Sequence, residues 1–134
     1  MKLKEYNSEN TVTIKTGKPT IRFNAKGLIS ISVAANDIIK AKDKSKCLFH
    51  QDEERPKDWY LEMTEDNKGF TMKKTSNLKS PCLNIRAIVK NIGDSIGMNG
   101  SSSFVCLIGQ PQKFQDKTLF PIITKYAESQ KDKP

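Results

Sequence analysis

The single histidine of the chain is the first residue whose type and surroundings could do chemistry. His50 is followed by Gln51 and by three acidic residues, Asp52, Glu53 and Glu54, and imidazole and carboxylate groups together can bind a metal ion. Consecutive residues of one loop rarely point towards a common centre, however, and neither a second histidine nor a closely spaced cysteine pair completes a ligand set. We therefore interpret His50 as a strand-end residue beside a solvated acidic loop, and we expect no metal and no cofactor.

The cysteines are the next candidates. Cys47, Cys82 and Cys106 are odd in number, each lies in an apolar segment, and no two have metal-ligand spacing. Such residues are typical of buried free thiols in a reducing compartment. No serine stands in a nucleophile elbow, and Gly17-Lys18 lacks the remaining residues of a phosphate-binding loop. The sequence predicts a protein that is not an enzyme and has no small-molecule substrate, unless a pocket gathers His50 with distant carboxylates.

The charge of the chain favours polyanionic partners. It has 23 Lys and Arg residues against 15 Asp and Glu residues, a formal net charge of +8, and such a surplus suits nucleic acid or an anionic membrane face. The alternative is that the charge only aids solubility. One group of cations follows an expected hairpin and another follows an expected short helix, so together they could bind phosphates and release counterions. The candidate phosphate contacts are Lys18, Arg22, Lys26, Lys42, Lys44 and Lys46.

Aromatic side chains could add base stacking to these contacts. Phe23, Phe49 and Phe70 stand in apolar patterns that favour the core. Trp59 and Tyr60 are neighbours on an expected strand, so their side chains point to opposite faces. Tyr60 is the better candidate for exposure, because its hydroxyl tolerates water, and we add it to the candidate nucleic-acid contacts.

Alternating apolar and β-branched residues predict the strands that position these candidates. The expected strands cover residues 11–16, 20–24, 28–32, 47–50, 59–63, 69–73, 104–108 and 119–123. Helical periodicity adds a short helix at 33–41, capped by Ser32, and a longer amphipathic helix at 84–97, capped by Asn84. Pro121 cannot donate to a ladder, which predicts an edge strand or a bulge there. We predict an α+β fold that is mainly antiparallel sheet.

The length of the chain suits a single domain. We expect residues 1–10 to be a flexible N-terminus, residues 11–126 to form the domain, and residues 127–134 to be a loose C-terminal tail. The first residues carry charge but no apolar stretch of a secretion signal, and no run of about 18 apolar residues could span a membrane. We therefore expect a cytoplasmic protein with no membrane partner.

One segment resembles a known family. The run Gly27-Leu-Ile-Ser-Ile-Ser-Val-Ala-Ala-Asn-Asp-Ile-Ile39, followed by Lys42-Asp-Lys44 and Cys47-Leu-Phe49, resembles the swapped-hairpin transcription factors of the AbrB type. The resemblance covers about residues 20–73 and implies an intertwined homodimer whose basic strands and loops grip DNA.

The chain departs from that family at several positions. The family usually has proline where Ser32 stands, and basic residues where this chain has Leu28, Asn36 and Asp37. A second similarity is topological only: curved antiparallel strands followed by an amphipathic helix resemble the whirly-like regulators that bind single-stranded DNA.

Two functions follow from these observations. The first is nucleic-acid binding, to DNA rather than RNA and including a role in transcriptional regulation, by a homodimer. The second is a non-catalytic interaction or assembly module, such as a subunit of a larger complex or an antitoxin-like partner. The apolar segments 104–108 and 119–123 motivate the second function, because they could lie at a subunit interface.

Overall fold

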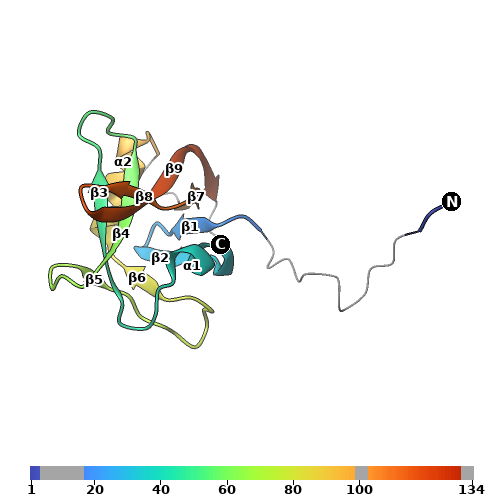
Figure 1. The fold of residues 1–134 in the computed structure, drawn as a ribbon. Coiled ribbons are helices and arrows are strands. Elements are labelled where there is room, and N and C mark those ends of the chain that lie inside the picture. The colour runs from blue at the N-terminus through green and yellow to red at the C-terminus, as the bar shows by residue number, and fades with distance from the viewer. Residues whose placement is uncertain (4–16, 99–102, 131–134) are drawn as a thin grey trace.

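The computed structural model describes residues 1–3, 17–98 and 103–130. The strand expected at 11–16 and most of the N-terminal segment 1–10 lie outside the described residues. The described part contains two helices, α1 (Val33–Ile39) and α2 (Arg86–Ser95), and a nine-stranded sheet (Figure 1). The strands are β1 (Thr20–Phe23), β2 (Leu28–Ile31), β3 (Lys46–Gln51), β4 (Trp59–Thr64), β5 (Phe70–Thr71), β6 (Cys82–Asn84), β7 (Ser103–Ile108), β8 (Gln112–Phe114) and β9 (Lys117–Gln130).

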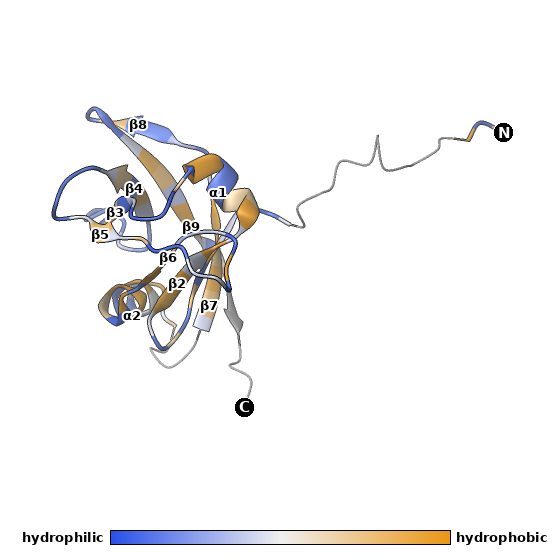
Figure 2. Cartoon of the chain, turned by 90° about the horizontal axis from the view of Figure 1, so that it is seen from below, coloured by the Kyte–Doolittle hydropathy of each residue, from blue (hydrophilic) through white to orange (hydrophobic). Residues whose placement is uncertain are grey.

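The strands pair antiparallel in the order β5-β3-β4-β9-β7-β1-β2-β6, and β8 pairs with β9. The first and last strands of this order meet at a bridge between Lys73 and Cys82, where each backbone N–H donates to the other residue's carbonyl at 2.8 Å. The sheet therefore curls into a nearly closed cylinder. Hydrophobic residues are concentrated on its strands and helices, and the loops are hydrophilic (Figure 2). The predicted α+β fold with a mainly antiparallel sheet is confirmed.

The cylinder is built from two halves with the same strand pairing. The first half is β1-β2-α1-β3-β4 and the second is β5-β6-α2-β7-β9. In this order β1 corresponds to β5, β2 to β6, β3 to β7 and β4 to β9. The pair β1–β7 then corresponds to the pair β5–β3, and the pair β3–β4 corresponds to the pair β7–β9. The pairs β2–β6 and β4–β9 map onto themselves. The chain thus has an approximate internal two-fold symmetry, and each half supplies strands to the other.

Equivalent positions of the two halves contribute to the same core. Cys47 on β3 faces Phe70 on β5, and Cys106 on β7 faces Ile21 on β1. Both cysteines are free and buried. By the same correspondence Trp59 matches Phe120, and both are buried. The buried residues of both halves therefore pack into one common core.

The short helix ends two residues earlier than the 33–41 expected from the sequence. Its start is as predicted, because Ser32 Oγ accepts from the Ala35 N–H at 3.1 Å. Its end is set by Asn36, whose side-chain oxygen accepts from the Ala41 N–H at 2.8 Å and whose amide donates to the Ala41 carbonyl at 3.2 Å. These bonds draw the chain back over the helix end, and Lys40 takes a left-handed φ of 60°.

The longer helix is also shorter than the predicted 84–97. Asn84, expected as its cap, is the last residue of β6 and pairs with Leu28, and the cap position is taken by Ile85 without a side-chain hydrogen bond. Val89 and Ile92 of the predicted apolar stripe are buried. Neither of the two described helices is long and apolar enough to cross a membrane.

Of the two alternatives predicted at Pro121, an edge strand or a bulge, the edge strand is wrong, and the register shift of β9 against β7 lies beyond Pro121, between Ile123 and Glu128. β9 lies between β4 and β7 in the interior of the sheet. The Pro121 carbonyl accepts from the Gly109 N–H at 2.9 Å, beyond the end of β7. Since the nitrogen and carbonyl of a strand residue point to the same side, the missing N–H does not interrupt the ladder with β4. β9 also continues to Gln130, past residue 126 where the sequence places the end of the domain, because its last residues pair with Ser103–Val105.

Removing two buried thiols should make the free energy of unfolding depend less on pH in the alkaline range. Burial raises the pKa of Cys47 and of Cys106 from 9.0 to about 12. The folded state therefore keeps these protons, so their contribution is complete below pH 9 and is lost as the pH rises towards 12. Each thiol adds a slope of about 1.4 kcal/mol per pH unit in that window. We expect the free energy of unfolding of a Cys47→Ala, Cys106→Ala variant, measured in urea, to fall less steeply above pH 9 than that of the wild type; parallel curves would contradict this.

Candidate functional site

Two chain segments account for most of the net positive charge. The connection from α1 to β3, residues 40–46, has four lysines and one aspartate, and the connection from β5 to β6, residues 73–80, has three lysines and no acidic residue. Together they carry a net charge of +6 of the +8 of the whole chain. We call the seven lysines of these segments the basic patch. They are Lys40, Lys42, Lys44, Lys46, Lys73, Lys74 and Lys79.

Backbone hydrogen bonds hold the two segments side by side. The Met72 N–H donates to the Ser45 carbonyl at 2.7 Å, and the Lys44 N–H donates to the Met72 carbonyl at 2.9 Å. The Lys74 N–H donates to Asp43 Oδ1, also at 2.9 Å. The one carboxylate within the two segments is thus engaged with a backbone donor. These contacts use backbone N–H groups, and the Lys74 ammonium group separately donates to the carbonyls of Thr75 and Leu78.

A shallow hollow of about 520 Å³ lies within the patch. It is lined by Lys40, Lys44 and Lys46, and by Glu65 from the loop after β4. Lys46 Nζ donates to Asn67 Oδ1 at 3.3 Å, which fixes that ammonium group at the rim. Three cations against one carboxylate give the hollow a mainly positive lining, which attracts anions such as phosphate groups.

The structure brings together only part of the set expected from the sequence. Lys42, Lys44 and Lys46 lie in the patch. Arg22 faces Ser30, Ser30 faces Cys82, and Cys82 faces Lys73. Directly paired residues project from the same face of a sheet. Arg22 and Lys73, both exposed, therefore share the outer face of the cylinder.

Lys18 and Lys26 lie at opposite ends of the β1–β2 hairpin. The Lys18 carbonyl accepts from Ser32 Oγ at 3.4 Å, beside the start of α1. Lys26 stands in the turn whose Gly27 carbonyl accepts from the Ile85 N–H at 2.9 Å, beside the start of α2. Lys26 is therefore remote from the patch along the hairpin.

Sequence reasoning missed the contribution of the β5–β6 connection. Lys73, Lys74 and Lys79 stand in a polar segment that looks like an ordinary linker. The sequence feature that could have indicated it is the presence of three lysines and no acidic residue among eight positions. Only the hydrogen bonds of Met72 and Lys74 to residues 43–45 reveal that this connection returns to the α1–β3 turn.

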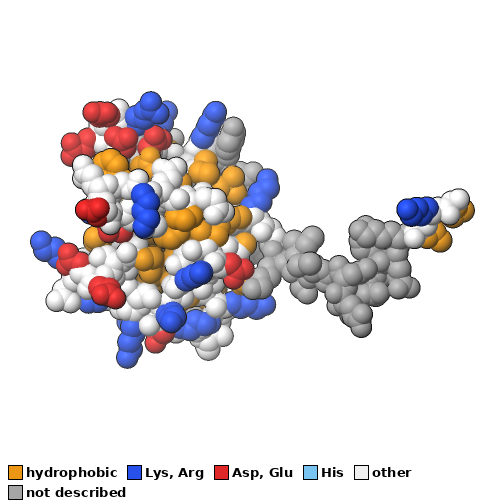
Figure 3. Space-filling view, in the orientation of Figure 1, with side chains coloured by type: hydrophobic (Ala, Val, Ile, Leu, Met, Phe, Trp, Pro, Cys, Tyr) orange, Lys and Arg blue, Asp and Glu red, His pale blue; other side chains and the backbone are white. Residues whose placement is uncertain are grey.

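The acidic loop lies apart from the patch. Trp59 Nε1 donates to Ser95 Oγ at 2.8 Å, which holds the end of the β3–β4 loop against α2. Figure 3 shows the densest group of acidic side chains over this loop at the top, while lysines and arginines gather along the lower edge, where the α1–β3 and β5–β6 connections lie. The two charges are therefore not neutralised by each other.

His50 pairs with a carboxylate that the sequence did not single out. His50 Nε2 lies 2.8 Å from Glu62 Oε1 on the neighbouring strand β4, and the carboxylate is largely buried. An imidazole held by a carboxylate can act as a base. Within the described residues, no three His, Cys, Asp or Glu side chains gather in the way a metal site requires.

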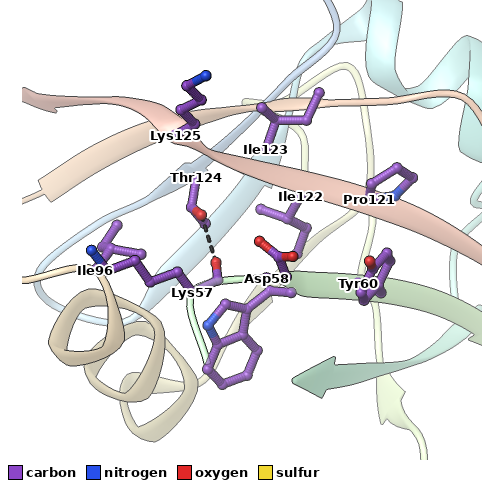
Figure 4. Close-up of a pocket in the computed structure, with 10 residues that line it drawn as sticks. Lys57, Asp58, Tyr60, Ile96, Pro121, Ile122, Ile123, Thr124 and Lys125 are labelled. Atoms are coloured by element: carbon purple, nitrogen blue, oxygen red, sulfur yellow. Dashed lines mark hydrogen bonds between the residues drawn. The ribbon is translucent and has the colours of Figure 1, made fainter. Parts of the chain in front are cut away.

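A second pocket, of about 560 Å³, lies between β9, the end of α2 and the start of β4. Figure 4 shows Asp58, Lys57 and Tyr60 on one side of it and Lys125 on the other, with Thr124 Oγ1 donating to the Lys57 carbonyl at 2.5 Å. Tyr60 is half-buried here, and its neighbour Trp59 is buried in the core. Tyr60 thus stands apart from the basic patch.

Comparison with known proteins does not assign the chain to a family. No family model matches it, and no significant match was found among curated proteins or solved structures.

Two lysines of the patch should be replaceable by glycine without loss of stability. Lys40 and Lys44 have φ values of 60° and 70°, a conformation that costs roughly 1–2 kcal/mol for a residue with a Cβ atom. Glycine removes that cost but adds up to about 1 kcal/mol of unfolded-state entropy. We expect Lys40→Gly and Lys44→Gly to leave the free energy of unfolding unchanged or up to about 1 kcal/mol higher, and Lys42→Gly to lower it. Equal destabilisation by all three, in urea denaturation, would contradict this.

Proposed function

We propose that the protein binds nucleic acid, DNA in the first place, through phosphate contacts made by the basic patch. The observation that supports this most directly is the pair of hydrogen bonds between Met72 and the α1–β3 turn, with the bond from the Lys74 N–H to Asp43 beside them. These contacts join two lysine-rich segments, separated in the sequence, on one part of the surface. Arg22 extends the same surface along the outer face of the sheet.

The chemistry of the patch suits a phosphate backbone better than a single small anion. Seven lysines are spread over two adjacent segments, so several phosphates can be contacted at once. Each phosphate neutralised releases condensed counterions, and the affinity then falls with salt by a log–log slope of about 0.9 per contact for duplex DNA and about 0.7 for single strands. Contacts of this kind set affinity and register rather than sequence choice.

The alternative, an assembly module, keeps part of the observation that motivated it, because Val105, Leu107 and Ile123 of the two apolar segments are only half-buried. Phe104, Cys106 and Ile108 of the first apolar segment and Phe120 and Ile122 of the second are buried in the core of the described fold. A homodimer stays a prediction, which light scattering on the same samples checks.

Salt-titrated binding to labelled oligonucleotides tests the proposal. We expect the triple variant Lys42→Gln, Lys44→Gln, Lys73→Gln to bind more weakly than the wild type, with a log–log salt slope smaller by about 3. The matched control, Lys26→Gln, Lys57→Gln, Lys90→Gln, removes the same charge at the other end of the molecule from residues that are all exposed. Its slope should stay close to that of the wild type. Fluorescence anisotropy measures both.

Two results would refute this assignment. One is the absence of any binding by the wild type at about 50 mM salt. The other is an equal loss of slope in the patch variant and in the control, because binding would then follow net charge and not the patch.

A further inference from the structure

The β8–β9 hairpin presents an aromatic side chain to solvent. Apart from Met1 and Leu3, Phe114 is the one exposed large hydrophobic residue of the described chain, with 58% of its surface accessible. Its direct cross-strand partner is Lys117, so the ring and this ammonium group project from the same face of the hairpin. The turn between them, Gln115 and Asp116, has φ values of 47° and 66°, as in a tight two-residue hairpin. The aromatic ring is therefore held on a short, defined arm.

This arm lies over the outer face of the cylinder. Leu119 shares a face with Glu62 of β4, its direct partner, and with Gln112 of β8. Leu119 points outward but is only 8% exposed, and it lines the groove beside the hairpin. Figure 1 shows the hairpin crossing in front of β3 and β4.

A groove of about 840 Å³ separates the arm from the β3–β4 loop. Phe114 and Lys117 line one side, Glu53 and Glu54 line the other, and His50 and Tyr60 lie between them. The groove thus offers a ring face beside a cation, with a second aromatic residue nearby. Those are the two elements of a site for a base and its phosphate.

One strand links the basic patch to the groove. Lys46, Leu48 and His50 are alternate residues of β3, so their side chains share its outer face. Lys46 lines the hollow of the patch and His50 lines the groove. Lys46 and His50 are four residue steps apart along the strand, about 13 Å. One extended strand of nucleic acid can therefore reach both.

We propose that Phe114 stacks on a base of a single-stranded nucleic acid whose phosphates bind the basic patch. The inference rests on the proposed function and specifies its target. A duplex keeps its base faces inside the stack and cannot offer one to Phe114, whereas a single strand can. Glu53 and Glu54 repel phosphate from their side of the groove, so the sugar–phosphate chain follows the Lys117 side and the base enters the groove.

Substitution of Phe114 tests this role. The probes are a labelled single strand of about 12 thymidines and a duplex of the same length, at about 50 mM salt. We expect Phe114→Ala to weaken single-strand binding about 5- to 150-fold and to change duplex binding by less than about twofold. Phe114→Trp should retain single-strand binding, and Glu53→Gln, Glu54→Gln should strengthen it. Thermal unfolding shows that the variants fold, which is expected because Phe114 is mostly exposed.

The outcomes separate this inference from the function on which it rests. Wild-type protein that binds neither probe overturns both. If Phe114→Ala binds single strands as well as the wild type does, while the patch variant still shows a smaller salt slope, only the stacking role is overturned. Equal weakening on both probes overturns the single-strand selectivity. Altered self-association of Phe114→Ala in light scattering, with unchanged nucleic-acid binding, would make the hairpin a protein contact instead.

Discussion

The pairing of each half of the chain with strands of the other is the constraint on which the rest of the structure depends. β1 lies between β2 of its own half and β7 of the second, and β5 pairs with β3 of the first. The stacked rings of Phe23 and Phe104, with centroids 5.0 Å apart, join the two halves in the core. Neither half buries its apolar residues alone, so local sequence patterns become stable elements only when the cylinder closes. Because the pairing is non-local, the position of each loop depends on strands that are distant in the sequence.

The basic patch follows from that closure. The bridge from Lys73 to Cys82 brings the end of β5 to the start of β6, and the residues between them must then form a loop at the rim of the cylinder. The same register places Met72 within hydrogen-bonding distance of the α1–β3 turn. Like charges in two loops repel each other, which costs energy that the burial of Met72 and Cys82 beside them offsets. A set of lysines held together at such a cost is what a surface for polyanions requires.

Local patterns in the sequence located most elements, and long-range contacts decided the rest. Alternation in β1 and β4 and the apolar stripe around Val89 and Ile92 are visible without a structure, because each element carries its own buried face. Strand β6 has three residues and exists because Ile29 and Leu83 pair across the two halves. Strand β8 is exposed throughout, so no alternation marks it. The internal symmetry is hidden because equivalent residues, such as Trp59 and Phe120, conserve burial and not type.

The sequence likewise predicts only part of the candidate site. Lys42, Lys44 and Lys46 stand out as a local run, but their neighbours Lys73 and Lys74 join them only through the closure of the sheet. The hydroxyl group of Tyr60 correctly indicates that Tyr60 is more exposed than Trp59. Phe114 could not be singled out, because exposure of a phenylalanine contradicts its usual place in a core. Its position depends on the tight turn at Gln115 and Asp116, which pairs it with Lys117.

The internal symmetry also limits how many strands of nucleic acid one chain can hold. The counterpart of the α1–β3 connection is residues 96–102, which carry no charged residue, and the counterpart of the β5–β6 loop is the short turn that contains Lys26 as its only charge. The two ends of the cylinder are thus alike in strand pairing and different in charge. The proposed phosphate contacts lie at one end, and the acidic β3–β4 loop stands at the other. The proposed function therefore implies one bound strand per chain, and a measured stoichiometry of two would show that the patch does not set the binding.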